Sequence, residues 1–162
     1  MNTQILKLLA KDARMSSKEI SVYTGLSEEE VNSQIHEMTQ KGIIRACKAV
    51  IDWEKLDDNG YVSAIVELKV TPKPGYGFEE VAKKVARYKE VESVYLLSGV
   101  SDLSLVVKCK TFQEVSRFVA KELAVMESIT STKTQFVMRR YKELDVALDV
   151  EESDDRGVVS SC

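Results

Sequence analysis

Two serine–glutamate pairs carry the most specific chemistry in this chain. Ser16 is followed three residues later by Glu19, and Ser27 is followed by Glu30 at the same spacing. At this spacing the serine oxygen accepts the N–H of the third residue, while the glutamate carboxylate accepts the N–H of the serine, which is the capping box that begins a helix. Gly25 between the pairs favours a turn. The pattern predicts two short helices joined by a tight turn, and the second helix of such a unit commonly enters a DNA groove.

The outward side of the second helix would carry short polar side chains able to hydrogen-bond to base edges. Glutamine can pair with adenine through two hydrogen bonds, and glutamate can accept one from cytosine. No residue between Lys18 and Lys41 is basic, so phosphate contacts must come from the flanks. We expect one dimer of the chain to bind DNA with modest affinity. Several dimers on adjacent half-sites would bind more tightly, because linkage between them raises their effective concentration. The predicted DNA-binding residues are Arg14, Ser16, Lys18, Ser27, Glu28, Asn32, Ser33, Gln34, Lys41, Arg45 and Lys48.

The residue pattern offers no support for other kinds of chemistry. The one histidine, His36, lies on the flank of the predicted second helix, and we interpret it as an ordinary surface residue. The three cysteines, Cys47, Cys109 and Cys162, are scattered, so they predict neither a disulfide framework nor a zinc site, and we expect Cys109 to be buried. The sequence holds neither a Ser–His–Asp set nor a phosphate-binding glycine loop. We therefore predict no catalytic residue, no metal and no cofactor.

Length and charge limit the class of protein further. With 162 residues and 44% hydrophobic residues, the chain can form one large domain or two small ones. Its apolar runs are too short to span a bilayer, and its first residues lack the pattern of a secretory signal, so we expect a cytoplasmic protein without membrane contact. The net charge is −3, and residues 148–162 carry one basic and five acidic side chains. We expect this acidic tail to be disordered.

Hydrophobic spacing predicts a helical domain with one strand in residues 1–55. Apolar residues recur at helical spacing, with Ile20 and Tyr23 inward on one helix, and Gly42 suits a left-handed helix end. Three helices followed by a strand form a winged helix-turn-helix, and a polar linker follows at 56–60. The predicted elements are helices over Thr3–Lys11, Ser17–Tyr23 and Glu28–Lys41 and a strand over Arg45–Trp53.

The spacing of apolar residues in 61–147 differs from that in the first 55 residues and predicts a second domain. Alternating apolar residues indicate strands, and apolar residues at i, i+3, i+4 and i+7 indicate amphipathic helices. The order strand, helix, strand, strand, helix, strand is the ferredoxin-like arrangement of an α+β domain, in which two helices cover one face of the sheet and leave the other bare. The predicted strands are Val62–Val70, Val91–Ser98, Leu103–Cys109 and Ile129–Tyr141, and the predicted helices start near Phe78 and after Thr111.

The bare face of this sheet predicts self-association. We expect Phe136 and Met138 to lie on it, and a second copy of the chain is the simplest cover for such a face. A twofold dimer would also suit a DNA site made of two parts.

The chain resembles the Lrp/AsnC, or feast/famine, family of bacterial and archaeal transcription regulators over residues 1 to about 145. The resemblance implies a winged helix-turn-helix joined to a ferredoxin-like effector-binding (RAM) domain, dimers that assemble into octamers or similar rings, and control by amino acids or related small molecules. The motifs that carry it are Ile5-Leu6, Asp12-Ala13-Arg14-Met15-Ser16, Gly25-Leu26-Ser27, Lys41-Gly42-Ile43-Ile44-Arg45, Ala49-Val50-Ile51-Asp52, Val94-Tyr95-Leu96-Leu97-Ser98-Gly99, Asp102-Leu103, Ile129-Thr130-Ser131-Thr132-Lys133-Thr134 and Phe136-Val137-Met138. The family usually has an arginine where this chain has Gln34.

The resemblance also implies an effector site between dimers, built from one loop and the last strand. Considered alone, Asp102 in that loop is a turn residue that caps its own backbone or a carboxylate that meets an ammonium group. Gly99 there permits a positive φ. The family pattern favours the ammonium role and adds two threonines that lie on one face of the strand. The predicted effector-binding residues are Gly99, Ser101, Asp102, Thr132 and Thr134.

Two alternatives to a DNA-binding regulator stay open from the residues. The first is an oligomeric metabolite sensor with little or no DNA affinity, which the acidic second helix of the unit allows. The second is an enzyme, because distant relatives of similar architecture act as sirohaem decarboxylases. Such an enzyme would need histidines and arginines around a tetrapyrrole, and this chain has one histidine.

Overall fold

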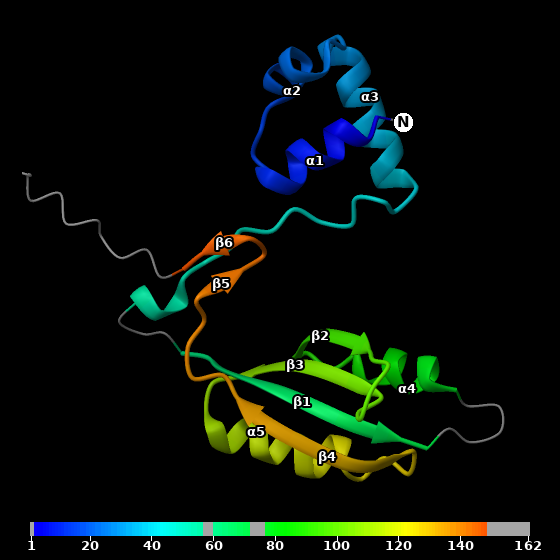
Figure 1. The fold of residues 1–162 in the computed structure, drawn as a ribbon, viewed down its shortest axis with the longest axis vertical. Coiled ribbons are helices and arrows are strands. Elements are labelled where there is room, and N and C mark those ends of the chain that lie inside the picture. The colour runs from blue at the N-terminus through cyan, green and yellow to red at the C-terminus, as the bar shows by residue number, and fades with distance from the viewer. Residues whose placement is uncertain (1, 57–59, 72–76, 149–162) are drawn as a thin grey trace, which may run out of the picture. The chain divides into compact units, whose positions relative to one another are not determined.

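The computed structural model describes residues 2–56, 60–71 and 77–148. The chain divides into two compact units, Met1–Ile51 and Asp52–Cys162 (Figure 1). Most of the predicted linker and the tail beyond Leu148 lie outside the described residues.

The first unit is a three-helix bundle. Its helices are α1 (Thr3–Lys11), α2 (Ser17–Thr24) and α3 (Glu28–Gln40). Each contributes an apolar face, and the fully buried side chains at their centre are those of Ile5, Ile20, Val31 and Met38. The three predicted helices are confirmed.

Both predicted turns of this unit contain a glycine in the left-handed region. Gly25 follows α2 with φ 72°, and Gly42 follows α3 with φ 66°. After Gly42 the chain folds back, and the N–H of Ile43 donates to the carbonyl of Met38 over 2.9 Å. These glycines are needed because other residues resist a positive φ.

Two predictions for this unit are wrong. Tyr23 was expected to point inward, but it is 62% exposed, because Ile20 alone of the two faces the other helices. Residues 45–52, all of which are described, contain no strand, and Trp53–Lys55 form a short 3-10 turn, η1. An extended segment needs a neighbouring strand for its backbone hydrogen bonds, and among described residues 2–51 there is none.

The second unit is an antiparallel sheet with helices on one face. Its strands lie in the order β2-β3-β1-β4, which confirms the ferredoxin-like arrangement. The elements in chain order are β1 (Val62–Val70), α4 (Phe78–Val85), β2 (Val91–Leu96), β3 (Leu103–Cys109), α5 (Phe112–Phe118), the π-helical turn η2 (Val119–Leu123) and β4 (Ile129–Phe136).

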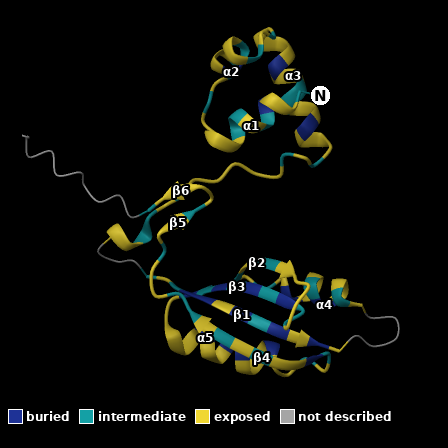
Figure 2. Cartoon of the chain, in the orientation of Figure 1, coloured by how far each residue is buried: buried dark blue, intermediate teal, exposed yellow. Residues whose placement is uncertain are grey.

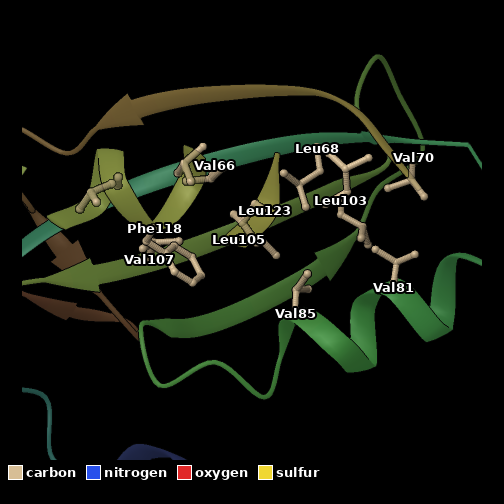
Figure 3. Packing of buried hydrophobic residues seen from close by; sticks show 14 of the residues in the cluster. Val66, Leu68, Val70, Val81, Val85, Leu103, Leu105, Val107, Phe118 and Leu123 are labelled. Atoms are coloured by element: carbon tan, nitrogen blue, oxygen red, sulfur yellow. The ribbon is translucent and has the colours of Figure 1, made fainter. Parts of the chain in front are cut away.

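The core of this unit lies between the sheet and its helices. Along β1, Ala64, Val66, Leu68 and Val70 are buried, while Ile65 between them is 39% exposed on the other face (Figure 2). The buried residues pack with apolar side chains of β3, α4, α5 and η2 (Figure 3). The α-helices of this unit therefore cover only one face of the sheet within the described chain.

The last strand is shorter than predicted. β4 ends at Phe136, which pairs with Ala64 near the start of β1, so the residues beyond Val137 have no strand of the sheet beside them. The chain then forms a separate hairpin of β5 (Lys142–Glu143) and β6 (Val146–Ala147), whose turn was not predicted.

The predicted position of Phe136 is also wrong. Residues that pair directly across antiparallel strands point to the same face, and Ala64 is in the core. Phe136 therefore lies on the helix-covered face, where its ring packs edge-to-face on Phe112 at 4.9 Å. Met138 lies past the end of β4 and is 88% exposed.

Candidate functional site

Both capping boxes of the α2–α3 pair form as predicted. The N–H of Ser16 donates to Glu19 Oε2 over 2.8 Å, and the N–H of Ser27 donates to Glu30 Oε2 over 2.9 Å. The return bonds, from each glutamate N–H to the serine Oγ, are 3.2 Å. Hydrogen bonds from the serines hold the pKa values of both carboxyls below the ordinary glutamate range. These glutamates therefore stabilise the helix ends as carboxylates.

The outer side of α3 is polar, and some of its side chains already form hydrogen bonds within the chain. Glu28 and Ser33 are exposed. Asn32 is exposed too, but its Oδ1 accepts a hydrogen bond from Ser17 Oγ on α2. Gln34 is half-buried, and its Oε1 accepts the N–H of Asn2 over 2.7 Å. The amide of Gln34 thus holds the amino end against α3, a role that the sequence pattern did not reveal.

The predicted cations are exposed on the flanks of the unit. Lys41 forms an ion pair with Glu37 one turn earlier, which lowers the pKa of that carboxyl. The guanidinium of Arg45 lies over Gly42, so that a Cβ added to the glycine would be 3.1 Å from Arg45 Cζ. Arg14, Lys18 and Lys48 are exposed as well.

In the second unit, Asp102 acts within the chain. Its Oδ2 accepts the N–H of Val70 over 2.7 Å, and its own N–H donates to the carbonyl of Leu68 over 3.0 Å. Its carbonyl accepts the N–H of Leu97 over 2.8 Å. The carboxylate therefore closes the end of β1 and fixes the loop between β2 and β3, which is the backbone-capping role.

The structure separates the remaining predicted effector residues. Thr132 and Thr134 pair with Leu68 and Val66, so they share a face, as predicted, and it is the helix-covered face. Ser101 is on the other side, where its Oγ donates to Glu67 Oε2 over 3.1 Å. In one chain the threonine and serine hydroxyls thus lie on opposite faces of the sheet.

Gly99 does not have the positive φ that was expected of it. Among the described residues, the glycines with positive φ are Gly25 and Gly42, and a Cβ at Gly99 would meet no atom within 4 Å. Gly99 is not required here by backbone strain.

A cluster around Glu67 was missed by sequence reasoning. Besides Ser101, Gln135 Nε2 lies 3.5 Å from its Oε1 and Lys133 Nζ lies 3.8 Å from its Oε2. Glu67, Ser101 and Lys133 line a pocket of about 430 Å³ on the bare sheet face, beside the β2–β3 loop. The one available signal was that Glu67 interrupts apolar β1 at a position opposite to its core side chains. The lining residues are Glu67, Lys69, Val100, Ser101, Ser131 and Lys133.

A second unpredicted cluster holds η1 against the sheet. Lys108 Nζ lies 5.7 Å from the ring centre of Trp53 and 5.5 Å from that of Tyr61, and the two rings meet edge-to-face at 5.8 Å. The same ammonium lies 3.3 Å from Glu92 Oε1. We call these four residues the Lys108 cluster.

The described residues hold neither a metal-binding cluster nor a membrane-spanning helix. No group of three or more His, Cys, Asp or Glu side chains there could hold a metal ion. No helix among them has the length and apolar character to cross a membrane.

Comparisons with known proteins agree with both units. Residues 2–45 match the winged helix-turn-helix DNA-binding family, and residues 63–146 match the Lrp/AsnC ligand-binding domain. The chain is 39% identical over 158 residues to the uncharacterised HTH-type transcriptional regulator YugG of Bacillus subtilis, covering 98% of this chain and 95% of that protein. It is 30% identical to the regulatory protein AsnC of Haemophilus influenzae, covering 86% of this chain and 90% of that protein.

A solved structure shows the same fold. The transcriptional regulator of Neisseria meningitidis in complex with L-methionine superposes with a TM-score of 0.68 at 23% identity, covering 86% of this chain and 89% of that one. The predicted fold class, a winged helix-turn-helix followed by a ferredoxin-like domain, is confirmed. The chain is accordingly a member of the Lrp/AsnC family, and so a DNA-binding transcriptional regulator with an Lrp/AsnC ligand-binding domain rather than an enzyme.

Proposed function

We propose that the chain binds double-stranded DNA as a homo-oligomer through the α2–α3 pair, and that an amino acid bound beside the β2–β3 loop controls this binding. The observation that carries the DNA-binding part is the doubly capped α2–α3 pair, whose second helix presents exposed Glu28, Asn32 and Ser33. A helix held this way can offer its outer side chains to base edges in a major groove.

Contacts to phosphate would come from exposed cations beside that helix. Of the five predicted cations, Lys41 alone has an ion pair within the described chain, so Arg14, Lys18, Arg45 and Lys48 can meet phosphates without losing a partner. The first 55 residues nevertheless carry eight basic and eight acidic side chains, which gives little general attraction to DNA. This supports a regulator that needs several linked copies.

The bare sheet face supports the proposed dimer. Ile65 and Tyr95 are exposed on it at 39% and 55%, and Val106 beside Ile65 is half-buried. These apolar side chains replace Phe136 as the expected contact, because Phe136 belongs to the core face. Packing of two such faces would bury them and would pair two α2–α3 units. Further assembly into an octamer, with the effector between dimers, is what the family resemblance predicts.

The effector is proposed to be an amino acid. The Neisseria meningitidis relative was solved with L-methionine, and this chain has the corresponding domain. The β2–β3 loop with Gly99, Ser101 and Asp102 remains the proposed site, whereas Thr132 and Thr134 could join it only from the helix side of the edge strand β4. A DNA-binding role would place the chain in the cytoplasm of a bacterial or archaeal cell.

The experiment is to select genomic DNA fragments with the purified chain and then titrate the selected site at several salt concentrations. We expect log K to fall linearly with log salt, with a slope that shrinks by about 0.9 for each phosphate contact removed. Arg45→Gln should show this change. Lys83→Gln, on the exposed face of α4 in the other unit, is the matched control. If no fragment is retained while amino acids still bind, the chain is a metabolite sensor without DNA affinity.

A further inference from the structure

A hollow on the helix side of the second unit carries three cations without an ionic partner. It has a volume of about 630 Å³ and lies beside α5 and η2, at the end of the sheet where β1 begins and β3 ends. Lys110, Arg117 and Lys121 line it, and all three are exposed. None of the three forms an ion pair within the described part of the chain. We call them the α5 cations.

The other charged side chains that line this hollow are already engaged. Lys89 Nζ lies 4.0 Å from Glu90 Oε1, and Lys108 belongs to the Lys108 cluster. Glu114 Oε2 accepts the backbone N–H four residues earlier over 3.0 Å. Glu122 is hydrogen-bonded to a tyrosine hydroxyl of the turn between α4 and β2. The α5 cations are therefore the charged groups of this surface that can meet an added ligand, and that ligand must be an anion.

The form of the surface suits an extended polyanion better than a compact anion. Arg117 and Lys121 are four residues apart on the continuous segment of α5 and η2, so they are neighbours on one side of it, and Lys110 precedes this segment. The described chain has one buried side-chain oxygen without a hydrogen bond, Ser63 Oγ, and it does not line this hollow. A row of exposed cations without a buried donor fits the regular phosphates of a nucleic acid.

The charges of the two units indicate what such a contact would add. Residues 1–55 carry eight basic and eight acidic side chains, whereas residues 61–147 carry fourteen basic and eleven acidic ones. The net attraction to phosphates therefore resides in the second unit, although α3 belongs to the first.

The hollow is also clear of the surfaces proposed for the dimer and for the effector. Its floor includes Cys109 and Phe118, which belong to the core between the sheet and its helices, so it lies on the side away from the bare sheet face. The β2–β3 loop is at the other end of β3, a strand of seven residues, or about 23 Å. The α5 cations thus remain accessible when two bare sheet faces pack together.

We infer that the α5 cations form a second DNA-contacting surface, which binds backbone phosphates of the duplex that α3 meets. This inference rests on the proposed function, because it needs a duplex bound by the α2–α3 pair. The contact adds affinity without sequence information, since phosphates are alike at every base pair. The proposed oligomer brings several copies to one duplex, and the α5 cations of any of them can make the contact.

The first measurement is the salt dependence of DNA binding by the full chain, with the genomic fragment selected as described above. The wild type is compared with the triple variant Lys110→Gln, Arg117→Gln, Lys121→Gln. At about 0.9 for each phosphate contact, the slope of log K against log salt should shrink by about 2.7 per bound chain. The two titration lines should then meet near about 1 M salt, and the affinity at about 0.1 M salt should fall about 500-fold.

The matched control removes the same charge elsewhere in the second unit. The triple variant Lys83→Gln, Lys84→Gln, Lys142→Gln changes α4 and β5, outside the hollow. Its slope should differ from that of the wild type by less than about 0.9, the effect of one contact. All six positions are exposed, and thermal unfolding verifies that both variants are folded.

The second measurement reports contact directly. N-hydroxysuccinimide acetate acetylates exposed lysine amines, and peptide mass spectrometry gives the rate at each lysine with and without the DNA fragment. We expect the DNA to protect Lys110 and Lys121 but not Lys83. Polyglutamate, the second probe, should protect them less, because its charges are about 3.3 Å apart along the chain and those of the duplex about 1.7 Å apart.

The outcomes distinguish this inference from the proposed function. If the wild type binds the fragment and the α5 triple variant keeps its slope, or if DNA leaves Lys110 and Lys121 unprotected, the inference is wrong while the regulator stands. An equal loss of slope in the control variant would show an effect of net charge and would also overturn it. Equal protection by polyglutamate would overturn DNA as the occupant in favour of an acidic protein. If the wild type retains no fragment, the proposed function and the inference both fall.

Discussion

Replacing Lys108 by methionine should loosen the Lys108 cluster and free η1 from the sheet. The ammonium of Lys108 contacts Trp53 and Tyr61 through their ring faces and pairs with Glu92, and its side chain is 19% exposed. Methionine keeps most of the apolar stem but removes the charge. The substitution therefore tests the electrostatic contacts more than the packing.

The expected loss of stability follows from these contacts. Each cation–π contact at a partly exposed site contributes about 0.5–1 kcal/mol. The ion pair, between side chains that are 19% and 42% exposed, adds about 0.2–1 kcal/mol. Because both rings share one ammonium, these values do not add fully, and we expect a total of about 1–2 kcal/mol.

The assay is urea unfolding followed by the fluorescence of Trp53, the only tryptophan in the chain. Since Trp53 belongs to the second unit, its signal reports that unit apart from the helical bundle. Lys83→Met is the matched control, because Lys83 has an ion pair of the same 3.3 Å length but no ring contact among the described residues.

Two results would refute this reasoning. One is an unfolding midpoint and an emission maximum for Lys108→Met that equal those of the wild type. The other is a double-mutant cycle of Lys108→Met with Tyr61→Leu that gives no coupling energy, since side chains that stabilise each other should show about 0.5–1 kcal/mol.

Four further outcomes are expected. Ser27→Ala should lower the stability of the helical unit by about 1 kcal/mol in denaturant unfolding followed by circular dichroism. Since the pKa of Glu30 is lowered in the folded state, its contribution should be present above the ordinary value of 4.5 and lost as the pH falls through the lowered pKa, which a stability–pH series of the wild type can test. Asp102→Ala should destabilise the sheet unit by about 1–3 kcal/mol, while Asp102→Asn, which keeps an acceptor oxygen, should cost less; equal losses would contradict the capping role. Burial raises the pKa of the Cys109 thiol, so iodoacetamide should alkylate exposed Cys47 first at pH 8, as peptide mass spectrometry would show.

The parts of the fold that local chemistry controls could be predicted from the sequence. A capping box involves residues three apart, so Ser16 and Ser27 locate the starts of α2 and α3 directly. Strand β3 was predicted with its observed bounds because a strict alternation of buried residues runs from Leu103 to Cys109. Such signals lie within a few residues of one another and need no knowledge of the remaining chain.

The errors concern features that depend on distant segments. The strand expected after α3 has no neighbour to pair with, and β4 ends where β1 begins, which only the register between strands reveals. The face of Phe136 follows from its pairing with Ala64, seventy-two residues earlier in the chain. Alternation predicts that side chains switch faces, but the register decides which face is the core.

In the candidate site, too, local features could be predicted and those that depend on distant segments could not. That Asp102 lies in a tight loop could be predicted, but its bond to the end of β1 spans 32 residues. The sequence did not single out Glu67, because Lys133 and Gln135 lie beside it only through the pairing of β4 with β1. Sequence reasoning therefore located the loop and missed the neighbouring carboxylate.

The acidic first turn of α3 stabilises the helix but weakens its attraction to DNA. Assembly of several copies can compensate for this weak binding. Glu28, Glu29 and Glu30 occupy its first turn, where the helix dipole favours negative charge, but the same turn would approach phosphates. If a single unit binds DNA only at the nonspecific level of about 10⁻⁴ M, and linked units meet at an effective concentration of about 1 mM, two units reach about 10⁻⁵ M and four reach about 10⁻⁷ M. On the proposed assembly, tight binding thus requires more than one dimer, and a ligand that shifts assembly would switch DNA binding without touching α3.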